Sequence, residues 1–153
     1  EPCKANHFLA EHAKLLIKSY RHLTGQHLVT ETSDPAYAAQ QLYEAPFFVA
    51  SHNTESDPIL TYGNRTAQTL FEMTWNEFTQ TPSRFTAEEP NREERARLLQ
   101  RVTTDGFIDD YSGVRISSNG QRFQIEQATV WNLLDGAGKR IGQAATFGQW
   151  RLL

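Results

Sequence analysis

The sequence predicts one α+β domain: a five-stranded antiparallel sheet, helices across one face, and an amino-terminal helical extension on the other. Three observations predict it. The first 44 residues repeat apolar side chains with a helical period, residues 45–106 alternate short strand and helix patterns, and residues 107–150 indicate strands joined by tight turns. A chain of 153 residues can bury one core and is short for two domains. We therefore expect a helical extension over residues 1–44 and the sheet domain over residues 45–150.

The first third predicts two amphipathic helices. Across residues 6–23, side chains that can pack recur at three- and four-residue steps, and Gly25 ends the helix. Asp34 and Pro35 then provide an N-cap and a first helical residue, and Pro46 ends the second helix. The inner face of this second helix is predicted to hold Tyr37, Ala38, Gln41 and Leu42.

The middle third predicts two short strands followed by helices. Residues 47–50 form an apolar run typical of a buried strand, and residues 59–62 form a second strand. Asn64 is placed to cap the helix that follows, and Asn91 starts a longer helix that Gly106 closes. The inner face of the longer helix is predicted to hold Ala96, Leu99 and Val102.

The last third changes to the period of two that marks strands. Asn119-Gly120 predicts a two-residue hairpin turn, and residues 135–138 predict a looser one, between strands at about 108–117, 122–134 and 140–147. Alternation along the middle strand places these side chains on one face: Phe123, Ile125, Gln127, Thr129, Trp131 and Leu133. The opposite face, too apolar for water, holds Ala128, Val130, Asn132 and Leu134. We expect the amino-terminal helix to cover that face, from the same chain or from a second copy.

This order of elements resembles that of a PAS domain. Residues 59–64 resemble the stretch in which the second PAS strand ends at a capping asparagine, and residues 89–95 resemble the opening of the long PAS helix. The two turns lie where PAS domains place their hairpins. The resemblance implies a PAS-like antiparallel sheet of strand order 2-1-5-4-3, with a ligand site between the helices and the last three strands.

More specifically, the chain resembles bacterial single-domain members of the MEKHLA family, which is PAS-like. The segments that carry the resemblance are residues 19–25, 57–65, 109–116 and 123–132, and together they extend it over about residues 6–147. The resemblance implies a sensory or regulatory module. Because isolated PAS domains often pair, it also implies a homodimer and signalling through a partner protein.

Composition excludes some partners and leaves the compartment as an expectation. The net charge is −3, so a basic face for nucleic acid is not expected. No apolar run approaches the roughly 20 residues that cross a bilayer, so no membrane association is expected. The single cysteine, Cys3, cannot form an internal disulfide, and the first residues show no signal-peptide pattern. A cytoplasmic protein is expected.

The sequence shows no catalytic or metal-binding motif. A nucleophile elbow, a Gly-rich phosphate loop and paired cysteines are missing, and the adjacent Asp109 and Asp110 should point to opposite faces of a strand. The five histidines lack the four-residue helical spacing of a metal site, and His52 alone lies near the expected pocket, where it could hold a haem. No metal ligand is predicted.

One stretch resembles light-sensing PAS domains of the LOV type. Those domains carry a reactive cysteine before an Arg-Phe pair, and here Ser83 precedes Arg84 and Phe85. A flavin adduct needs a thiol, so that photochemistry is excluded at this position. Flavin binding without an adduct stays open as an alternative, and the cofactor, if there is one, is not identified.

We expect a ligand site between the helices of residues 64–86 and the last three strands. The predicted site residues are Trp75, Arg84, Phe85, Tyr111, Arg115, Gln127, Trp131 and Gln143. Aromatic side chains would bury an apolar body, the glutamines can donate and accept hydrogen bonds, and Arg84 and Arg115 could hold an anion. A solid core with satisfied polar groups would give the same pattern. The expected function is a non-catalytic sensory module that binds an unidentified small molecule, a partner protein or both. The alternative is a small-metabolite enzyme that uses the same pocket.

Overall fold

A computed structural model describes residues 1–153, apart from the side chain of Pro90. The helices are η1 (Lys4–Leu9), α1 (Ala10–Thr24), α2 (Pro35–Tyr43), α3 (Arg65–Phe71), α4 (Trp75–Phe78), η2 (Ser83–Thr86) and α5 (Glu89–Asp105), of which η1 and η2 are 3₁₀ helices. The strands are β1 (Phe48–His52), β2 (Leu60–Gly63), β3 (Phe107–Ile116), β4 (Arg122–Leu134), β5 (Arg140–Phe147) and β6 (Gln149–Leu152).

The strands form one antiparallel sheet in the order β2-β1-β5-β4-β3, which confirms the predicted order. β6 was not predicted. β4 is 13 residues long, so its carboxyl half pairs with β5 while its amino half pairs with β6 through residues 123–126. β5 and β6 therefore follow one another along the same edge of β4, separated by Gly148.

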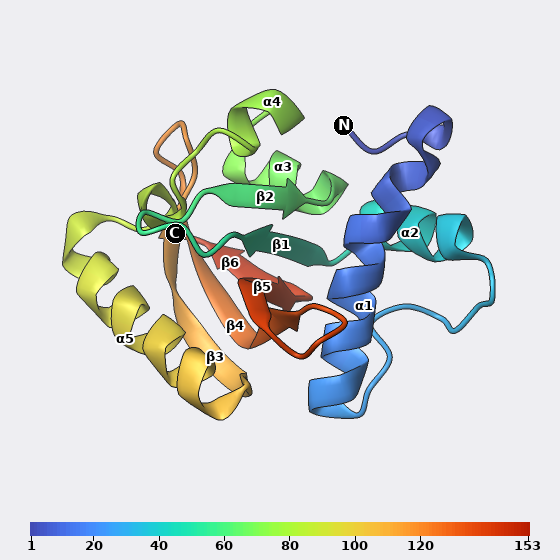
Figure 1. Ribbon diagram of the computed structural model, residues 1–153. Helices are drawn as coiled ribbons and strands as arrows, with labels where there is room; N and C mark the ends of the chain where they lie inside the picture. Colours follow the sequence, from blue (N-terminus) through green and yellow to red (C-terminus); the bar gives the residue numbers. More distant parts are fainter.

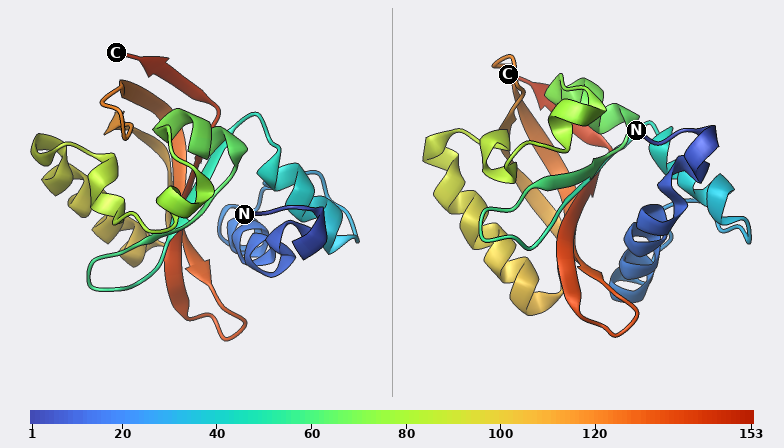
Figure 2. Two further views of the ribbon diagram at one scale, coloured as in Figure 1. Left: turned by 90° about the horizontal axis from the view of Figure 1, so that it is seen from above. Right: turned by 45° about the horizontal axis from the view of Figure 1, so that its top comes forward.

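The sheet separates two layers of helices (Figures 1 and 2). α1 and α2 cover one face, which we call the extension face, and α3, α4 and α5 lie over the other, the pocket face. Each face has its own hydrophobic cluster. Leu16, Leu42 and Trp131 belong to the cluster on the extension face, and Phe71, Phe78 and Val102 belong to that on the pocket face. Because both faces are buried, the central strands β1, β4 and β5 have to present apolar side chains on both sides.

The amino-terminal helix lies on the predicted face but starts later than the predicted residue 6. His7, Phe8 and Leu9 have positive φ angles of 54–55°, so they cannot belong to a regular α-helix. The turn that they make brings the ring of Phe8 to 6.4 Å from that of Tyr43. α1 proper begins at Ala10 and ends at Gly25, whose φ of 75° is the left-handed conformation that closes helices.

Two predicted inner faces were right at Leu42, Leu99 and Val102 but were centred about one residue away from the buried stripe. On α2 the buried residues are Ala39, Leu42 and Tyr43, whereas Tyr37 is 53% exposed. On α5 the buried residues are Leu98 and Val102, whereas Ala96 is exposed. A one-residue error rotates a helix by about 100°, so each contact surface moved to the neighbouring stripe. On α5 this rotation brings Arg95 to the inner side.

A bulge in β4 overturns the predicted division of its side chains between the faces. Gln127 has a φ of 49°, and it interrupts the alternation between Ile125 and Ala128. Before the bulge, odd-numbered residues such as Ile125 face the pocket side. After it, Ala128 and Val130 do so, whereas Trp131 and Leu133 join the extension-face cluster. The predicted set from Phe123 to Leu133 is thus divided between two faces, and α1 covers Trp131 rather than Val130.

Asn64 joins three elements through a fully buried side chain. Its Oδ1 accepts hydrogen bonds from the backbone N–H groups of Ala67 (3.0 Å) and Val49 (3.1 Å). Its Nδ2 donates to the carbonyl oxygens of Leu42 (3.1 Å) and Phe47 (2.8 Å). The predicted cap of α3 is confirmed, and the same amide also holds the end of α2 against the start of β1.

Both hairpins use three-residue loops that end in a left-handed glycine. In the first, Ser117 pairs with Gln121 around Gly120, which has a φ of 88°. The loop is therefore one residue longer than the two-residue turn predicted from Asn119-Gly120. In the second, Asp135 pairs with Lys139 around Gly138, which has a φ of 81°. A glycine at this position is the usual solution for three-residue loops because it carries no Cβ.

The docking of α1 can be tested at Leu16, which is fully buried in the extension-face cluster. Leu16→Ala should lower the free energy of unfolding by about 3 kcal/mol, because it removes buried methyl groups and leaves a cavity. Lys18→Ala, on the exposed side of the same helix, should change it by less than about 0.5 kcal/mol. Denaturant titration measures both values. Equal midpoints for the two variants would contradict a docked α1.

Asn64→Ala should cost more than an ordinary helix cap, about 3 kcal/mol or more, because it leaves two buried N–H groups and two carbonyl groups without their partner. Asn76→Ala, at an exposed position of α4, serves as the matched control. If thermal or chemical unfolding shows the same stability for both variants, the amide does not join α2, β1 and α3 as described.

Candidate functional site

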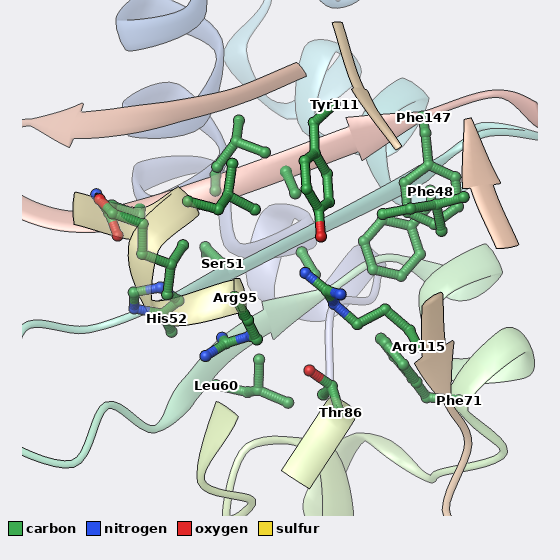
Figure 3. A pocket seen from close by; sticks show the side chains of 18 residues that line it. Phe48, Ser51, His52, Leu60, Phe71, Thr86, Arg95, Tyr111, Arg115 and Phe147 are labelled. Atoms are coloured by element: carbon green, nitrogen blue, oxygen red, sulfur yellow. The ribbon is translucent and has the colours of Figure 1, made fainter. Parts of the chain in front are cut away.

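A cavity of about 80 Å³ lies between α5 and the pocket face of the sheet. Its apolar wall comes mainly from Phe48, Leu60, Phe71, Leu98, Ile125 and Phe147. Its polar residues are Ser51, His52, Thr86, Arg95, Tyr111, Arg115 and Gln143. Figure 3 shows Arg95 and Arg115 reaching into the same space, with Tyr111 above them and Thr86 below. The lining residues come from β1, β2, β3, β4, β5, α3, η2 and α5, so the complete fold is needed to assemble them.

Arg115 is a buried cation at the centre of the cavity wall. It lies on β3, is only 8% exposed, and one of its N–H groups donates to the carbonyl oxygen of Val114 at 2.8 Å. Its guanidinium lies 5.4 Å from the centre of the Tyr111 ring. The Tyr111 hydroxyl donates to the carboxylate of Glu94 at 3.1 Å. Burial raises the pKa of Tyr111, while the Arg115 charge lowers it and Glu94 raises it, so the phenol stays protonated at neutral pH.

Gly113 allows this arrangement of Tyr111. A Cβ at position 113 would lie 2.7 Å from Cζ of the Tyr111 ring, closer than side chains approach one another. The ring can therefore fold back along β3 only because residue 113 has no side chain. The segment from Tyr111 to Arg115 thus places a phenol and a guanidinium on the same face of one strand.

Arg95 supplies a second cation from the opposite wall. It is half-buried on the inner side of α5, one turn before Leu98 and Leu99. Burial, together with the positive charge of Arg115, lowers its pKa to about 10. The Arg95 guanidinium is therefore still protonated at neutral pH. Among the described side chains, neither Arg95 nor Arg115 has a carboxylate oxygen within 4.0 Å, so two like charges share one small space.

His52 is a buried and neutral hydrogen-bond acceptor on the same wall. Its Nδ1 lies 2.8 Å from the carbonyl oxygen of Asn53, which makes Nδ1 the protonated nitrogen. Its Nε2 is buried and has no hydrogen-bond partner among the described atoms. Burial lowers the pKa of His52 to about 4, against the opposing effect of the Asn53 carbonyl, and the charge of Arg95 adds to the lowering. Nε2 therefore presents a lone pair.

Gln143 connects the cavity floor to α5. Its Nε2 donates to the carbonyl oxygen of Leu99 at 3.1 Å, and contacts Thr103 Oγ1 and Asn132 Oδ1 at 3.0 Å each. Asn132 in turn donates to the carbonyl oxygen of Val102 at 3.0 Å. Two neighbouring strands thus hydrogen-bond to the backbone of α5 directly beside the cavity.

The cavity brings together three of the eight residues predicted for the site. Tyr111, Arg115 and Gln143 line it. Arg84 and Phe85 lie outside: the guanidinium of Arg84 pairs with Asp57 at 3.0 Å and stacks 4.4 Å from the centre of the Phe85 ring. Both are exposed.

The other three predicted residues are not in the cavity. Gln127 is exposed at the bulge, and Trp131 is fully buried on the extension face, 5.0 Å from Tyr20 between ring centres. Trp75 packs edge-on against Tyr62 in the same extension-face cluster. The bulge explains two of these outcomes, because without it Gln127 and Trp131 would share a face with Ile125.

One important cavity residue, Arg95, was missed although it had a signal in the sequence, and His52, expected near the pocket, was considered only as a haem ligand. Arg95 precedes Leu98 and Leu99 by three and four residues, so a charged residue occupies a position of the apolar stripe. Arg97, on the exposed side of the same helix, pairs with Glu93 at 3.1 Å. His52 ends a buried strand, where an unpaired imidazole is unusual.

The cavity does not fit a flavin. Pockets that hold molecules of that size have volumes of roughly 300 Å³ or more, well above the volume here. Ser83, at the position of the LOV cysteine, is buried in η2 and does not line the cavity. Among the described side chains, no group of three or more His, Cys, Asp and Glu residues is placed to hold a metal ion.

Comparison with known proteins decides the family. The model of the MEKHLA domain matches residues 10–152, nearly the whole chain. This chain belongs to the MEKHLA domain family. A relative, the homeobox-leucine zipper protein ATHB-14 of Arabidopsis thaliana, is 28% identical over 100 residues, which are 65% of this chain and 12% of that protein. The MEKHLA domain thus corresponds to a small part of that longer protein.

Solved structures confirm that this MEKHLA domain has the PAS fold. A PAS domain from Colwellia psychrerythraea superimposes with a TM-score of 0.62 at 12% identity, covering 76% of this chain and 94% of that one. An RNA-binding light-oxygen-voltage receptor superimposes with a TM-score of 0.65 at 17% identity, covering 79% of this chain and 35% of that one. A fungal LOV photoreceptor superimposes with a TM-score of 0.57 at 14% identity, covering 90% of this chain and 91% of that one.

In the described part of the chain, no helix combines the length and apolarity that crossing a membrane requires.

The buried imidazole predicts acid sensitivity. The pKa of His52 is lower in the folded protein, about 4, than its ordinary 6.5. The unfolded chain therefore binds the proton first as pH falls, and the free energy of unfolding should drop between about pH 6.5 and about pH 4, by on the order of 3 kcal/mol. Burial also lowers the pKa of His12, so His12 should further lower the free energy of unfolding as pH falls.

Denaturant titrations across that range should show the loss in the wild type. In His52→Phe the pH dependence should be much smaller, with only the share of His12 left. His22→Phe, an exposed position of α1, should keep the wild-type slope. Identical slopes for the wild type and His52→Phe would show that the imidazole is not held neutral.

Proposed function

We propose that this MEKHLA domain is a non-catalytic sensory module that binds a small molecule in the cavity beneath α5. The observation that carries the proposal is the convergence of polar side chains from β1, β3, β5 and α5 on one buried space with an apolar wall. Small-molecule sites combine such walls with a few polar groups that fix orientation. A solid core would not need two guanidiniums and an unpaired imidazole nitrogen in the same place.

The cavity is also placed to pass a signal on. α5 is held to the sheet by Gln143 and Asn132 at the edge of the cavity. On the other face of these strands, the hydroxyl of Ser19 in α1 contacts the backbone of Leu134, with the Leu134 N–H donating at 2.9 Å. A ligand that shifts α5 or β4 would therefore change the surface that α1 and α2 contact, and a partner protein could respond to that change.

The chain gives less support to the enzyme alternative. Asp109 and Asp110 are both exposed. A histidine–serine contact does exist, with His12 Nε2 3.0 Å from Ser51 Oγ, but Ser51 is 2% exposed beneath α1 and its hydroxyl also contacts Thr61 at 2.9 Å. Ser51 also lines the cavity, but its hydroxyl is engaged with His12 and Thr61. The contact is better explained as a means of holding α1 to β1.

Native mass spectrometry and an absorption spectrum of protein purified from its own host would test ligand binding directly. The proposal predicts a retained mass that is lost on denaturation. Together with analytical ultracentrifugation, the same sample tests the predicted homodimer. The cytoplasmic location is likewise a proposal, which imaging of the full-length protein in its host would check.

A cavity-filling variant separates binding in this cavity from binding elsewhere. Ala145 lines the cavity on β5, so Ala145→Leu should fill it and abolish the thermal stabilisation given by the retained molecule, while the unliganded protein stays folded. Ala137→Leu, in the exposed turn after β4, should bind as the wild type does. Should Ala145→Leu not fold, Ala50→Val, at a second lining position, replaces it. Undiminished stabilisation in a folded cavity-filled variant would overturn the proposed site.

A further inference from the structure

The cavity holds two positive charges that the described chain does not neutralise. Arg115 is buried, Arg95 is half-buried, and neither has a carboxylate within salt-bridge distance among the described side chains. The carboxylate of Glu94 accepts a hydrogen bond from the Tyr111 hydroxyl rather than pairing with either arginine. Like charges in a space of low polarity repel strongly, and a bound anion would remove that repulsion. A guanidinium also offers a fork of N–H donors that matches a carboxylate.

A second feature restricts the ligand further. Nε2 of His52 is a buried acceptor with no described partner, on a side chain that lines the same cavity. In Figure 3, Arg95 lies between His52 and Arg115. An anion alone cannot satisfy Nε2, because a carboxylate oxygen is also an acceptor. A ligand that meets both requirements needs a negative charge at one end and an O–H or N–H donor at the other.

The size of the cavity limits what lies between these groups. A space of about 80 Å³ holds several times the roughly 10–15 Å³ that one water needs, and is smaller than the roughly 300 Å³ typical of sites for drug-sized ligands. The rings of Phe48 and Phe147, stacked 4.3 Å apart, form part of the apolar wall. This wall suits a short carbon skeleton.

We propose that the cavity recognises a small hydroxycarboxylate: Arg95 and Arg115 hold the carboxylate, and His52 Nε2 accepts a hydrogen bond from the ligand's hydroxyl group. The inference rests on the proposed function and specifies its ligand class. It assigns Arg95, which the sequence did not place in the site, and His52, which the sequence placed only near the pocket, to the two ends of one ligand.

Three probes of nearly equal size separate the two requirements. Lactate carries the charge and the hydroxyl, propanoate lacks the hydroxyl, and lactamide lacks the charge. Isothermal titration calorimetry should give a Kd for lactate about tenfold lower than for propanoate, because one hydrogen bond to a buried acceptor is lost. Lactamide should bind about 100-fold more weakly than lactate, or not at all, because a charge-assisted contact to buried cations is lost.

Variants assign each effect to its residue. His52→Phe keeps a ring of similar shape, and should bring lactate and propanoate to the same Kd without weakening propanoate. Arg95→Gln and Arg115→Gln should each weaken both carboxylates at least about tenfold and leave lactamide unchanged. Arg97→Gln, on the exposed side of α5, is the matched control and should bind all three probes as the wild type does. If Arg115→Gln does not fold, Arg115→Lys, which keeps the charge and loses the fork of donors, replaces it.

The outcomes distinguish this inference from the proposed function. Equal affinity for lactate and propanoate in the wild type, or sulfate binding as tightly as lactate, overturns recognition of a hydroxycarboxylate. Recognition of a hydroxycarboxylate is also overturned if the retained molecule lacks a carboxylate and is lost in Ala145→Leu. That result would support the sensory module. If folded Ala145→Leu retains the same molecule as the wild type, the cavity is not the binding site and both proposals fail.

Discussion

The bulge at Gln127 is the constraint on which the rest of this structure depends. β4 is the strand that pairs with β3, β5 and β6, and its two halves have opposite phases. A strand without the bulge would turn Trp131 into the pocket face and leave Val130 beneath α1. With it, the large indole fills the extension face against Tyr20, and the smaller Ala128 and Val130 face α5. Space for a cavity therefore exists only because one residue of β4 adopts a left-handed conformation.

Hydrogen bonds from side chains to the backbone hold the two layers of helices on this sheet. Asn64 joins α2, β1 and α3, Gln143 and Asn132 reach α5, and Ser19 reaches the end of β4. Such buried amides are satisfied on several sides at once, so they favour one arrangement of the elements over others that would leave them unpaired. His52 and the two cavity arginines do not follow this pattern. The cavity differs from the remainder of the core in its charge, because Arg95 and Arg115 line it and neither has a carboxylate partner among the described side chains.

The relation to photoreceptors of the same fold shows how little the fold alone says about the ligand. Superposition with LOV proteins is at identities of 17% or less, so it shows the fold alone. In this chain the space lies between α5 and the sheet. Its occupant depends on which side chains reach into the space, and here these are cations, an imidazole and a phenol rather than a thiol.

The amino-acid sequence by itself determined the class of the fold, the order of its strands, the hairpins, the cap at Asn64 and the family, because these depend on local signals: period, turn residues and capping residues. It also identified Tyr111, Arg115 and Gln143, which lie on strands whose phase was right at those positions. Only the tertiary structure decided the phase of α2 and α5, the bulge in β4 and hence the opposite placement of Trp131 and Val130. The physical reason is that both faces of this sheet are buried, so alternation between apolar and polar residues carries little information about side. A one-residue shift leaves such a pattern nearly unchanged while moving every side chain to a new neighbour.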